Sequence, residues 1–176
     1  MSIAIKKDIR LWSKEDLIAW FVEQGEQKFR AKQVYEWLWQ KGAHTFSEMT
    51  NLSKSLRTKL EQEFVINAIQ VDKVQHSSDG TIKTRFKLHD GHLIESVLIP
   101  VPKDKRFTVC VSSQVGCSLS CTFCATGKMK RVRNLDPAEI YDQVVLVNRQ
   151  AIEHFGNPLT NIVYMGMGEP LSLIHI

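Results

Sequence analysis

Three of the four cysteines lie within eight residues, in the segment GCSLSCTFCATG at residues 116–127. They are Cys117, Cys121 and Cys124, in the spacing C-x3-C-x2-C, and six residues separate the first of them from Cys110. Thiolates bind zinc, hold iron-sulfur clusters or carry out redox chemistry. The first twenty residues contain scattered charges and no apolar signal segment, so we expect a cytoplasmic protein whose cysteines do chemistry rather than form a disulfide framework.

A zinc site is one interpretation of these cysteines. Structural zinc usually takes two C-x2-C pairs, or one such pair with two histidines. Here Cys121 and Cys124 form the one pair with that spacing, and His89 and His92 lie upstream in a predicted hairpin turn. A Cys2His2 zinc site therefore has weak support from the sequence.

An iron-sulfur cluster makes use of all three clustered cysteines. A redox C-x2-C pair leaves Cys117 without a role, and Cys110 is an awkward fourth ligand because it belongs to a predicted strand. Three protein ligands to a four-iron cluster leave one iron without a protein ligand, and a small molecule can bind there. We therefore favour the cluster over zinc.

A second segment that could do chemistry is MGMGEP, residues 165–170. Its glycines allow the backbone to approach a ligand closely, because no Cβ intervenes, and Glu169 can accept hydrogen bonds from an ammonium group. A glycine-rich turn after a strand is the common alternative. The segment follows a predicted strand, and α/β folds bind ligands at the carboxyl ends of their strands, which favours the ligand interpretation.

The first third of the chain is predicted to be helical. Ser13 is a suitable cap for a helix that reaches Gly25, and two further helices are expected at about residues 28–41 and 51–63. Their polar faces carry several lysines and arginines, which more often mean a solvated surface than an RNA-binding one. The predicted apolar faces comprise Leu17, Ile18, Phe21, Val22, Phe29, Val34, Tyr35, Leu38, Trp39, Leu52, Leu56 and Leu60.

The rest of the chain changes from antiparallel to alternating structure. Residues 69–100 alternate in twos around two Asp-Gly turns, at 79–80 and 90–91, which predicts a three-stranded meander. A strand at FTVCVSS, a helix from Asp136 to Gly156 and an apolar strand at NIVYMGMG then form one β-α-β unit. An apolar strand of that kind is typically buried in a parallel sheet.

Several of these segments together closely resemble the RlmN/Cfr family of radical S-adenosylmethionine (SAM) RNA methyltransferases. They are FRAKQVYEWLWQKG, LIESVLIP, TVCVSSQVGCSLSCTFCATG, RNLDPAEIYDQV and NIVYMGMGEPL, at residues 29–42, 93–100, 108–127, 133–144 and 161–171. The resemblance covers nearly the whole chain in order. It implies an α/β fold, with a small N-terminal helical domain and an antiparallel meander followed by the start of a partial (β/α) radical SAM barrel.

The resemblance also implies roles for individual residues. Cys117, Cys121 and Cys124 would ligate a [4Fe-4S] cluster. Phe123 would lie against the cluster and SAM, and Gly168 and Glu169 would contact SAM. Cys110 corresponds to the cysteine that resolves a protein–RNA intermediate through a transient disulfide, and Glu95 to the proton acceptor.

The chemistry that the resemblance implies explains why a radical is needed. An adenine ring carbon is too electron-poor to attack a methyl sulfonium. In this family one SAM methylates a cysteine and a second supplies the radical that activates that methyl group, while the protein supplies position and excludes water. We favour carbon 2 of an adenine in large-subunit ribosomal RNA, with transfer RNA as a further substrate; a carbon-8, Cfr-type activity and a non-catalytic RNA-binding module with structural zinc are the alternatives.

The domains and partners follow from the same comparison. We expect a helical RNA-binding domain at residues 1–65, a meander at 66–102 and the first β/α units of the radical SAM core at 103–176. The basic run KMKRVR, residues 128–133, suits RNA phosphates, and the net charge of +4 agrees weakly with a polyanionic partner. No run approaches the roughly 18 apolar residues of a membrane span. We expect a monomer that receives electrons from a low-potential donor such as flavodoxin or ferredoxin.

The C-terminal end indicates a truncated reading frame. A (β/α)8 barrel takes about 250 residues, whereas residues 103–176 supply only two predicted barrel strands. The resemblance stops at Leu171, and LSLIHI is what a common transposon-derived sequencing adapter encodes. The methyl-carrying cysteine of the family lies near the far end of the barrel, and all four cysteines here already have roles. We therefore expect an inactive fragment.

Overall fold

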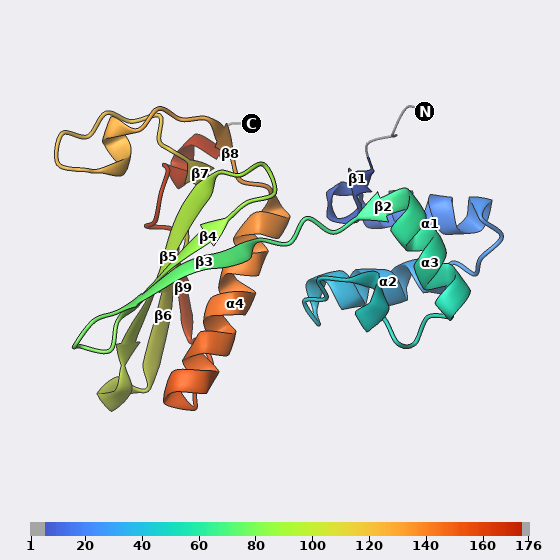
Figure 1. The fold of residues 1–176 in the computed structure, drawn as a ribbon, viewed down its shortest axis with the longest axis horizontal. Helices are drawn as coiled ribbons and strands as arrows, with labels where there is room; N and C mark the ends of the chain where they lie inside the picture. The colour runs from blue at the N-terminus through green and yellow to red at the C-terminus, as the bar shows by residue number, and fades with distance from the viewer. Residues whose placement is uncertain (1–5, 174–176) are drawn as a thin grey trace. The chain divides into compact units, whose positions relative to one another are not determined.

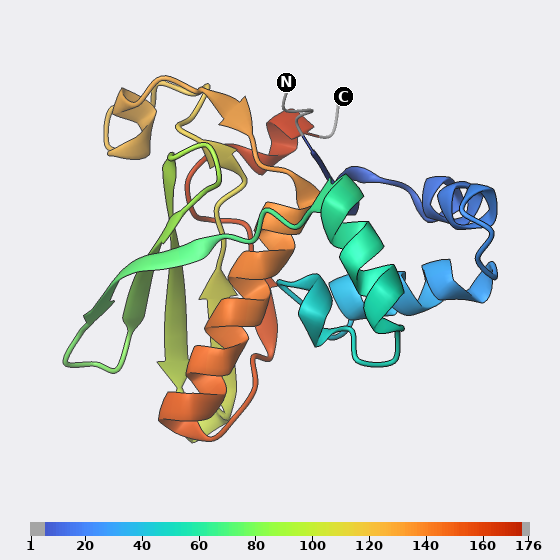
Figure 2. The same cartoon turned by 45° about the vertical axis from the view of Figure 1, so that its right-hand side comes forward.

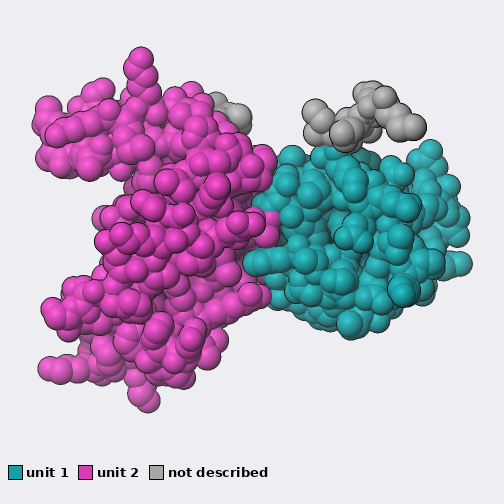
Figure 3. Space-filling view, viewed as in Figure 1, with its two compact units in different colours: residues 1–67 teal, residues 68–176 magenta. Residues whose placement is uncertain are grey.

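The computed structural model describes residues 6–173. The chain divides into two compact units, residues 1–67 and residues 68–176, and each is described by itself (Figure 3). The segment predicted to be foreign begins at Leu171, and its residues 174–176 lie outside the described part of the chain.

The first unit contains three α-helices with short flanking elements (Figure 1). The predicted cap at Ser13 is confirmed, because its hydroxyl accepts a hydrogen bond from the Asp16 N–H and the Asp16 carboxylate accepts one from the Ser13 N–H. The third helix begins at Lys54 rather than at residue 51, since Ser53 caps it. The elements are β1 Lys7–Asp8, η1 Ile9–Leu11, α1 Lys14–Glu23, α2 Phe29–Trp39, η2 Phe46–Glu48, α3 Lys54–Glu63 and β2 Phe64–Val65.

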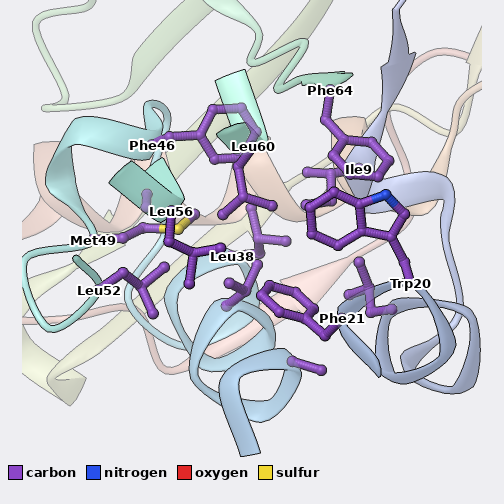
Figure 4. Packing of buried hydrophobic residues seen from close by; sticks show 14 residues of the cluster. Ile9, Trp20, Phe21, Leu38, Phe46, Met49, Leu52, Leu56, Leu60 and Phe64 are labelled. Carbon is purple, nitrogen blue, oxygen red and sulfur yellow. The ribbon is translucent and has the colours of Figure 1, made fainter. Parts of the chain in front are cut away.

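The helices of the first unit enclose a hydrophobic core (Figure 4). Most of the predicted apolar residues lie in it or pack against it, but Val22 and Phe29 are 48% and 52% exposed. On α1, Trp20 is buried and Val22 is not. Residues three and four apart share one face of a helix, so Trp20 and Phe21 lie on the same buried face as Leu17. The helical pattern thus predicted most of the core, and the exceptions are Val22 on α1 and Phe29 on α2.

The second unit is built on a five-stranded sheet in the order β3-β4-β5-β6-β9 (Figure 1). The predicted meander is confirmed: β3, β4 and β5 are antiparallel, and Gly80 and Gly91 take positive φ angles at the two Asp-Gly turns. The elements of the unit are β3 Gln70–His76, β4 Ile82–Lys87, β5 Leu93–Val101, η3 Pro102–Asp104, β6 Arg106–Cys110, β7 Gln114–Val115, η4 Thr126–Lys128, β8 Arg133–Asn134, α4 Pro137–Phe155, β9 Asn161–Val163 and η5 Pro170–Leu173.

The sheet is continuous across the boundary predicted at residue 102. Strand β5 pairs antiparallel with β6, and β6 pairs parallel with β9, which is the expected β-α-β connection. The observed architecture is therefore the predicted α/β class, with the meander and the first two parallel strands in one sheet. A domain division at residue 102 stays a prediction.

Helix α4 covers one face of the sheet (Figure 2). Its predicted start and end are confirmed, because Asp136 and Glu139 form a capping box, Pro137 lies in the first turn and Gly156 ends the helix with a φ of 68°. Alternate residues of β4, β5 and β6 are buried on the helix side. The residues between them lie on the opposite face, which remains partly exposed.

Strand β9 differs from its prediction. It was expected to be an apolar strand buried in a parallel sheet, but it is three residues long and Ile162 is 50% exposed. Among the described residues β9 is the edge of the sheet, since the strand order ends there. A parallel strand is buried only when both of its faces are covered, and the described chain covers this one incompletely.

Across residues 6–173, no helix combines the length and the apolar character needed to cross a membrane.

Candidate functional site

The three clustered cysteines lie on one closed loop. Strands β7 and β8 pair antiparallel at its base, and an isolated parallel bridge joins Cys117 and Lys130 further into the loop. Gly116 has a φ of 76°, and a Cβ there would lie 2.1 Å from the backbone oxygen of Lys130. Only glycine permits such an approach, so Gly116, directly before Cys117, allows the two ends of the loop to come together.

The loop presents its thiols to solvent in one short segment. All three are half-buried free thiols, the Cys124 N–H donates to the Cys121 carbonyl at 3.1 Å, and the Leu119 N–H donates to Cys117 Sγ at 3.4 Å. The backbone N–H groups of Gly127 and Thr126 lower the pKa of Cys124, because they stabilise its thiolate. Phe123, between the last two cysteines, is 92% exposed.

A cavity of about 400 Å³ lies beside Cys117. Three cationic residues line it together with two serines. Its lining comprises Cys117, Ser118, Ser120, Gly127, Lys128, Met129, Lys130 and Arg131. Three thiols, donors that stabilise a thiolate and adjoining space suit the chemistry of a thiolate-ligated iron-sulfur cluster.

The structure does not assemble a finished metal site from these side chains. Within residues 6–173, no three His, Cys, Asp or Glu side chains are grouped closely enough to hold a metal ion. The two histidines of the zinc alternative are not grouped with cysteines, and His89 instead lies 3.6 Å from Glu139. Among the described residues, neither the Cys2His2 set nor the three clustered cysteines are brought together as a metal site.

The MGMGEP segment lies against the base of the cysteine loop, at the same end of the sheet (Figures 1 and 2). The N–H groups of Ser113 and Gln114 both donate to the Met167 carbonyl. Gly168 has a φ of 102°, and a Cβ there would lie 2.6 Å from the Gln114 Cβ. The glycine thus permits close approach to the chain's own backbone; contact with a ligand stays a prediction.

Glu169 is held mainly through its backbone. Its N–H donates to Gln114 Oε1 at 3.0 Å, and its own carboxylate accepts the Leu171 N–H at 2.9 Å. The side chain is half-buried beside the loop that carries the cysteines. The structure therefore brings the predicted SAM-contacting residues and the predicted cluster ligands to one end of the sheet.

Cys110 and Glu95 lie on the sheet face opposite α4. Cys110 pairs with Val97 across β5 and β6, and Glu95 is two residues from Val97, so their side chains point to the same face. Burial raises the pKa of the Cys110 thiol, an effect that a hydrogen bond from the Met165 backbone partly offsets. Glu95 Oε2 lies 2.7 Å from Lys83 Nζ.

Two buried glutamines were not singled out from the sequence. Gln143 on α4 accepts hydrogen bonds from the Ser96 hydroxyl and the Ser112 N–H, both at 2.8 Å, and donates to the Ser112 carbonyl. Gln114 contacts Glu169 as described above. For Gln114 the sequence did contain a signal, the run SSQ at residues 112–114. Three polar residues directly after an apolar strand are unusual in a buried part of a chain.

Arg133 at the exit of the loop was also missed as a structural residue. Its guanidinium makes two hydrogen bonds with the buried Glu139 carboxylate, at 2.7 and 2.8 Å, and one with Asp90 at 2.7 Å. These carboxylates raise the pKa of Arg133. The arginine belongs to the predicted RNA-binding run KMKRVR, but its charge is already neutralised within the protein.

The comparisons with known proteins agree with this geometry. The family model for the ribosomal RNA large subunit methyltransferase N-terminal domain matches residues 8–66. The chain is 60% identical to a probable dual-specificity RNA methyltransferase RlmN of Christiangramia forsetii and 61% identical to that of Cytophaga hutchinsonii, each over 94% of this chain. It covers 47% and 45% of those two proteins, so it spans about half of their length.

A solved structure shows the same fold. A radical SAM methyltransferase from Sphaerobacter thermophilus superposes with a TM-score of 0.81 at 39% identity, over 96% of this chain and 49% of that one. This chain therefore shares the fold of the matching part of a radical SAM methyltransferase. The matched N-terminal domain and the relatives of 60% and 61% identity are those of RlmN proteins, of which this chain spans about half the length.

Proposed function

We propose that this chain is part of a radical SAM enzyme that transfers a methyl group to carbon 2 of an adenine in large-subunit ribosomal RNA, and also in transfer RNA. The observation that carries the proposal is the attachment of the Gly168–Glu169 segment to the base of a three-cysteine loop. Relatives named as dual-specificity RNA methyltransferases support this reaction class and an RNA substrate.

Three cysteines of the chain would hold the cofactor. Cys117, Cys121 and Cys124 are the ligands of a [4Fe-4S] cluster, and Gly168 and Glu169 bind the amino end of SAM. When bound, the cluster and SAM supply the carbon radical that an electron-poor ring carbon requires. Phe123, which is exposed on the loop, packs over the bound cofactors and excludes water from them.

The open face of the sheet supplies the groups that finish the reaction. Glu95 accepts the proton that leaves the adenine carbon. The Cys110 thiolate then attacks the sulfur of the methyl-carrying cysteine, and the bond between that sulfur and the transferred carbon breaks. The two sulfurs form a disulfide, and the electron pair left on the carbon takes up a proton, which completes the methyl group on the released RNA. Burial raises the pKa of Cys110 and so favours the protonated thiol. That proton has to be removed before the sulfur can attack. Each of the four cysteines in this chain has another role, so by itself we expect the chain to be inactive.

RNA contact is assigned to two regions. Lys128, Lys130 and Arg131 are exposed on the cysteine loop, where phosphates can reach them. In the helical unit, Arg30 and Arg57 are bonded to backbone oxygens of Asn51 and Ser47. The remaining exposed lysines of α2 and α3 are therefore the better phosphate partners.

Deleting residues 1–65 tests the assignment of the helical unit. We expect the deletion to weaken RNA binding and to reduce its dependence on salt, because phosphate contacts are lost with the lysines. An unchanged salt dependence would refute the docking role. We further propose a monomer in the cytoplasm that takes electrons from flavodoxin or ferredoxin.

Two measurements test the proposed reaction. Anaerobic reconstitution of the chain with iron and sulfide should give a brown protein, whereas a colourless protein with one bound zinc would support the zinc module instead. The full-length protein should then yield 2-methyladenosine in ribosomal RNA, detected by mass spectrometry of nucleosides. 8-Methyladenosine as the sole product would instead identify a Cfr-type enzyme. The same assay with the 176-residue chain should give no product above background.

A further inference from the structure

We propose that Gln114 is a positioning residue, whose buried side chain fixes the backbone of Glu169 against the base of the cysteine loop. The inference rests on the proposed function, in which Glu169 contacts SAM and the loop holds the cluster. SAM would have to contact Glu169 and the cluster on the loop at the same time, so the protein has to set the distance between Glu169 and the loop. Gln114 is the side chain that sets it.

The side chain of Gln114 is fully buried and fully bonded. Its Oε1 accepts the Glu169 N–H at 3.0 Å, and its Nε2 donates to Asn134 Oδ1 and to Ser172 Oγ, each at 2.9 Å. A buried amide whose groups are all satisfied is costly to displace, because each group would lose its partner. Gln114 therefore holds its neighbours in one arrangement.

Gln114 and its neighbours come from three separate segments. Gln114 itself stands on β7, where the loop begins, and Asn134 stands opposite it on β8, where the loop ends. Glu169 follows β9, 55 residues after Gln114 in the sequence. One side chain thus joins the entry of the cysteine loop, its exit and the SAM-contacting segment.

The backbone contacts around Gln114 make this joint specific. The Gln114 N–H donates to the Met167 carbonyl at 3.2 Å. Gly168 approaches Gln114 so closely that a Cβ at position 168 would lie 2.6 Å from the Gln114 Cβ. A larger residue at position 168 would push the segment away from the loop. The glycine and the glutamine therefore act as a matched pair: the first allows the approach, and the second sets the register of Glu169.

A pair of variants of the 176-residue chain tests the inference. Gln114→Met removes the acceptor for the Glu169 N–H and keeps the side-chain volume. Gln143→Met is the matched control, because Gln143 is an equally buried amide that bonds Ser96 and Ser112 but not Glu169. If Gln114→Met fails to fold by circular dichroism, Gln114→Asn replaces it, since its shorter amide cannot reach Glu169.

The first readout needs no cofactor. Amide hydrogen exchange of the apo chain should speed up at Glu169 in Gln114→Met by about tenfold, the scale of one lost hydrogen bond, and less in Gln143→Met. Equal protection of the Glu169 amide in the two variants would overturn the inference. This measurement decides the placement of Glu169 even if the unmodified chain takes up no iron, a result that would instead count against the proposed function.

The second readout uses the reconstituted chain. Both variants should retain the iron content of the unmodified chain, but Gln114→Met should bind SAM about tenfold more weakly, since its contact residue is no longer pre-organised. The change that SAM causes in the electron paramagnetic resonance of the reduced cluster should shrink in Gln114→Met alone. An equal loss of SAM affinity in both variants would mean that Gln114 is merely structural.

Discussion

The two units of the chain bury their side chains in different ways. In residues 1–67, three helices surround a core of large apolar residues, and the helix starts at Ser13 and Ser53 carry side-chain caps. In residues 68–176, α4 covers one face of the sheet, while the other face exposes Glu95 and Cys110 in part. The residues assigned to chemistry lie where burial is incomplete.

This difference separates stability from function within the second unit. Gln114, Gln143 and Glu139 are buried polar residues of this unit, Arg133 binds Glu139 from a partly exposed position, and none of the four is a residue assigned to chemistry. They hold the loop and the strands that carry the site, whereas the site residues themselves remain accessible to small molecules. Variants of the two sets should therefore differ in what they disturb.

The largest effect is expected in the core of the first unit. Phe21→Ala should destabilise the chain by about 3–5 kcal/mol, because the ring is fully buried and its removal leaves a cavity. Phe29→Ala is the matched control: its ring is 52% exposed, so we expect a loss below about 1 kcal/mol. Urea unfolding measures both, and equal losses would show that the helical unit is not packed as described.

The second effect concerns the exit of the cysteine loop. Arg133→Met should cost about 2 kcal/mol, because it leaves the buried Glu139 carboxylate without its main partner; the arginine side chain is 26% exposed, which reduces the cost. Arg131→Met, two residues away, is the control, since Arg131 is exposed and its guanidinium donates to the neutral side chain of Asn134 rather than to a buried carboxylate. Thermal unfolding of the second unit alone, residues 68–176, should distinguish them. A larger loss in Arg131→Met would contradict the assignment.

The sequence predicted those features that depend on neighbouring residues. The Asp-Gly turns require positive φ at their glycines, and the capping boxes join residues three apart, so both can be found without knowing the fold. The cysteine spacing is likewise local. This is why the helices, the meander and the loop were predicted within a few residues of their observed positions.

The features that the sequence did not predict depend on distant contacts. Gln114 meets Glu169 across 55 residues and Gln143 meets Ser112 across 31, so no short pattern reveals either contact. The exposure of Ile162 was missed because a local pattern was present but misleading. An apolar run indicates a buried strand only when other elements cover both faces of that strand. Tertiary neighbours decide both cases.

A smaller effect should distinguish the thiol of Cys110 on the open sheet face from the thiol of Cys124 on the cysteine loop. Burial raises the pKa of Cys110, whereas backbone N–H groups lower that of Cys124. The thiolate is the reactive form, so Cys124 should begin to react with iodoacetamide at lower pH than Cys110 in the metal-free chain. Peptide mass spectrometry across a pH series measures both rates. Cys124→Ser should leave the Cys110 profile unchanged, and faster labelling of Cys110 at neutral pH would reverse the assignment of the two environments.

The smallest effect is expected at the Lys83–Glu95 pair on the open face. Nζ and Oε2 are 2.7 Å apart, but the side chains are 44% and 39% exposed, so water screens their attraction. Lys83→Met should therefore change the free energy of unfolding by less than about 1 kcal/mol, and a double-mutant cycle with Glu95→Gln should give a coupling of about 0.5 kcal/mol. A coupling several times larger would mean that Glu95 is held for the fold. The small coupling would leave its carboxylate available to exchange a proton with substrate, as the proposed reaction requires.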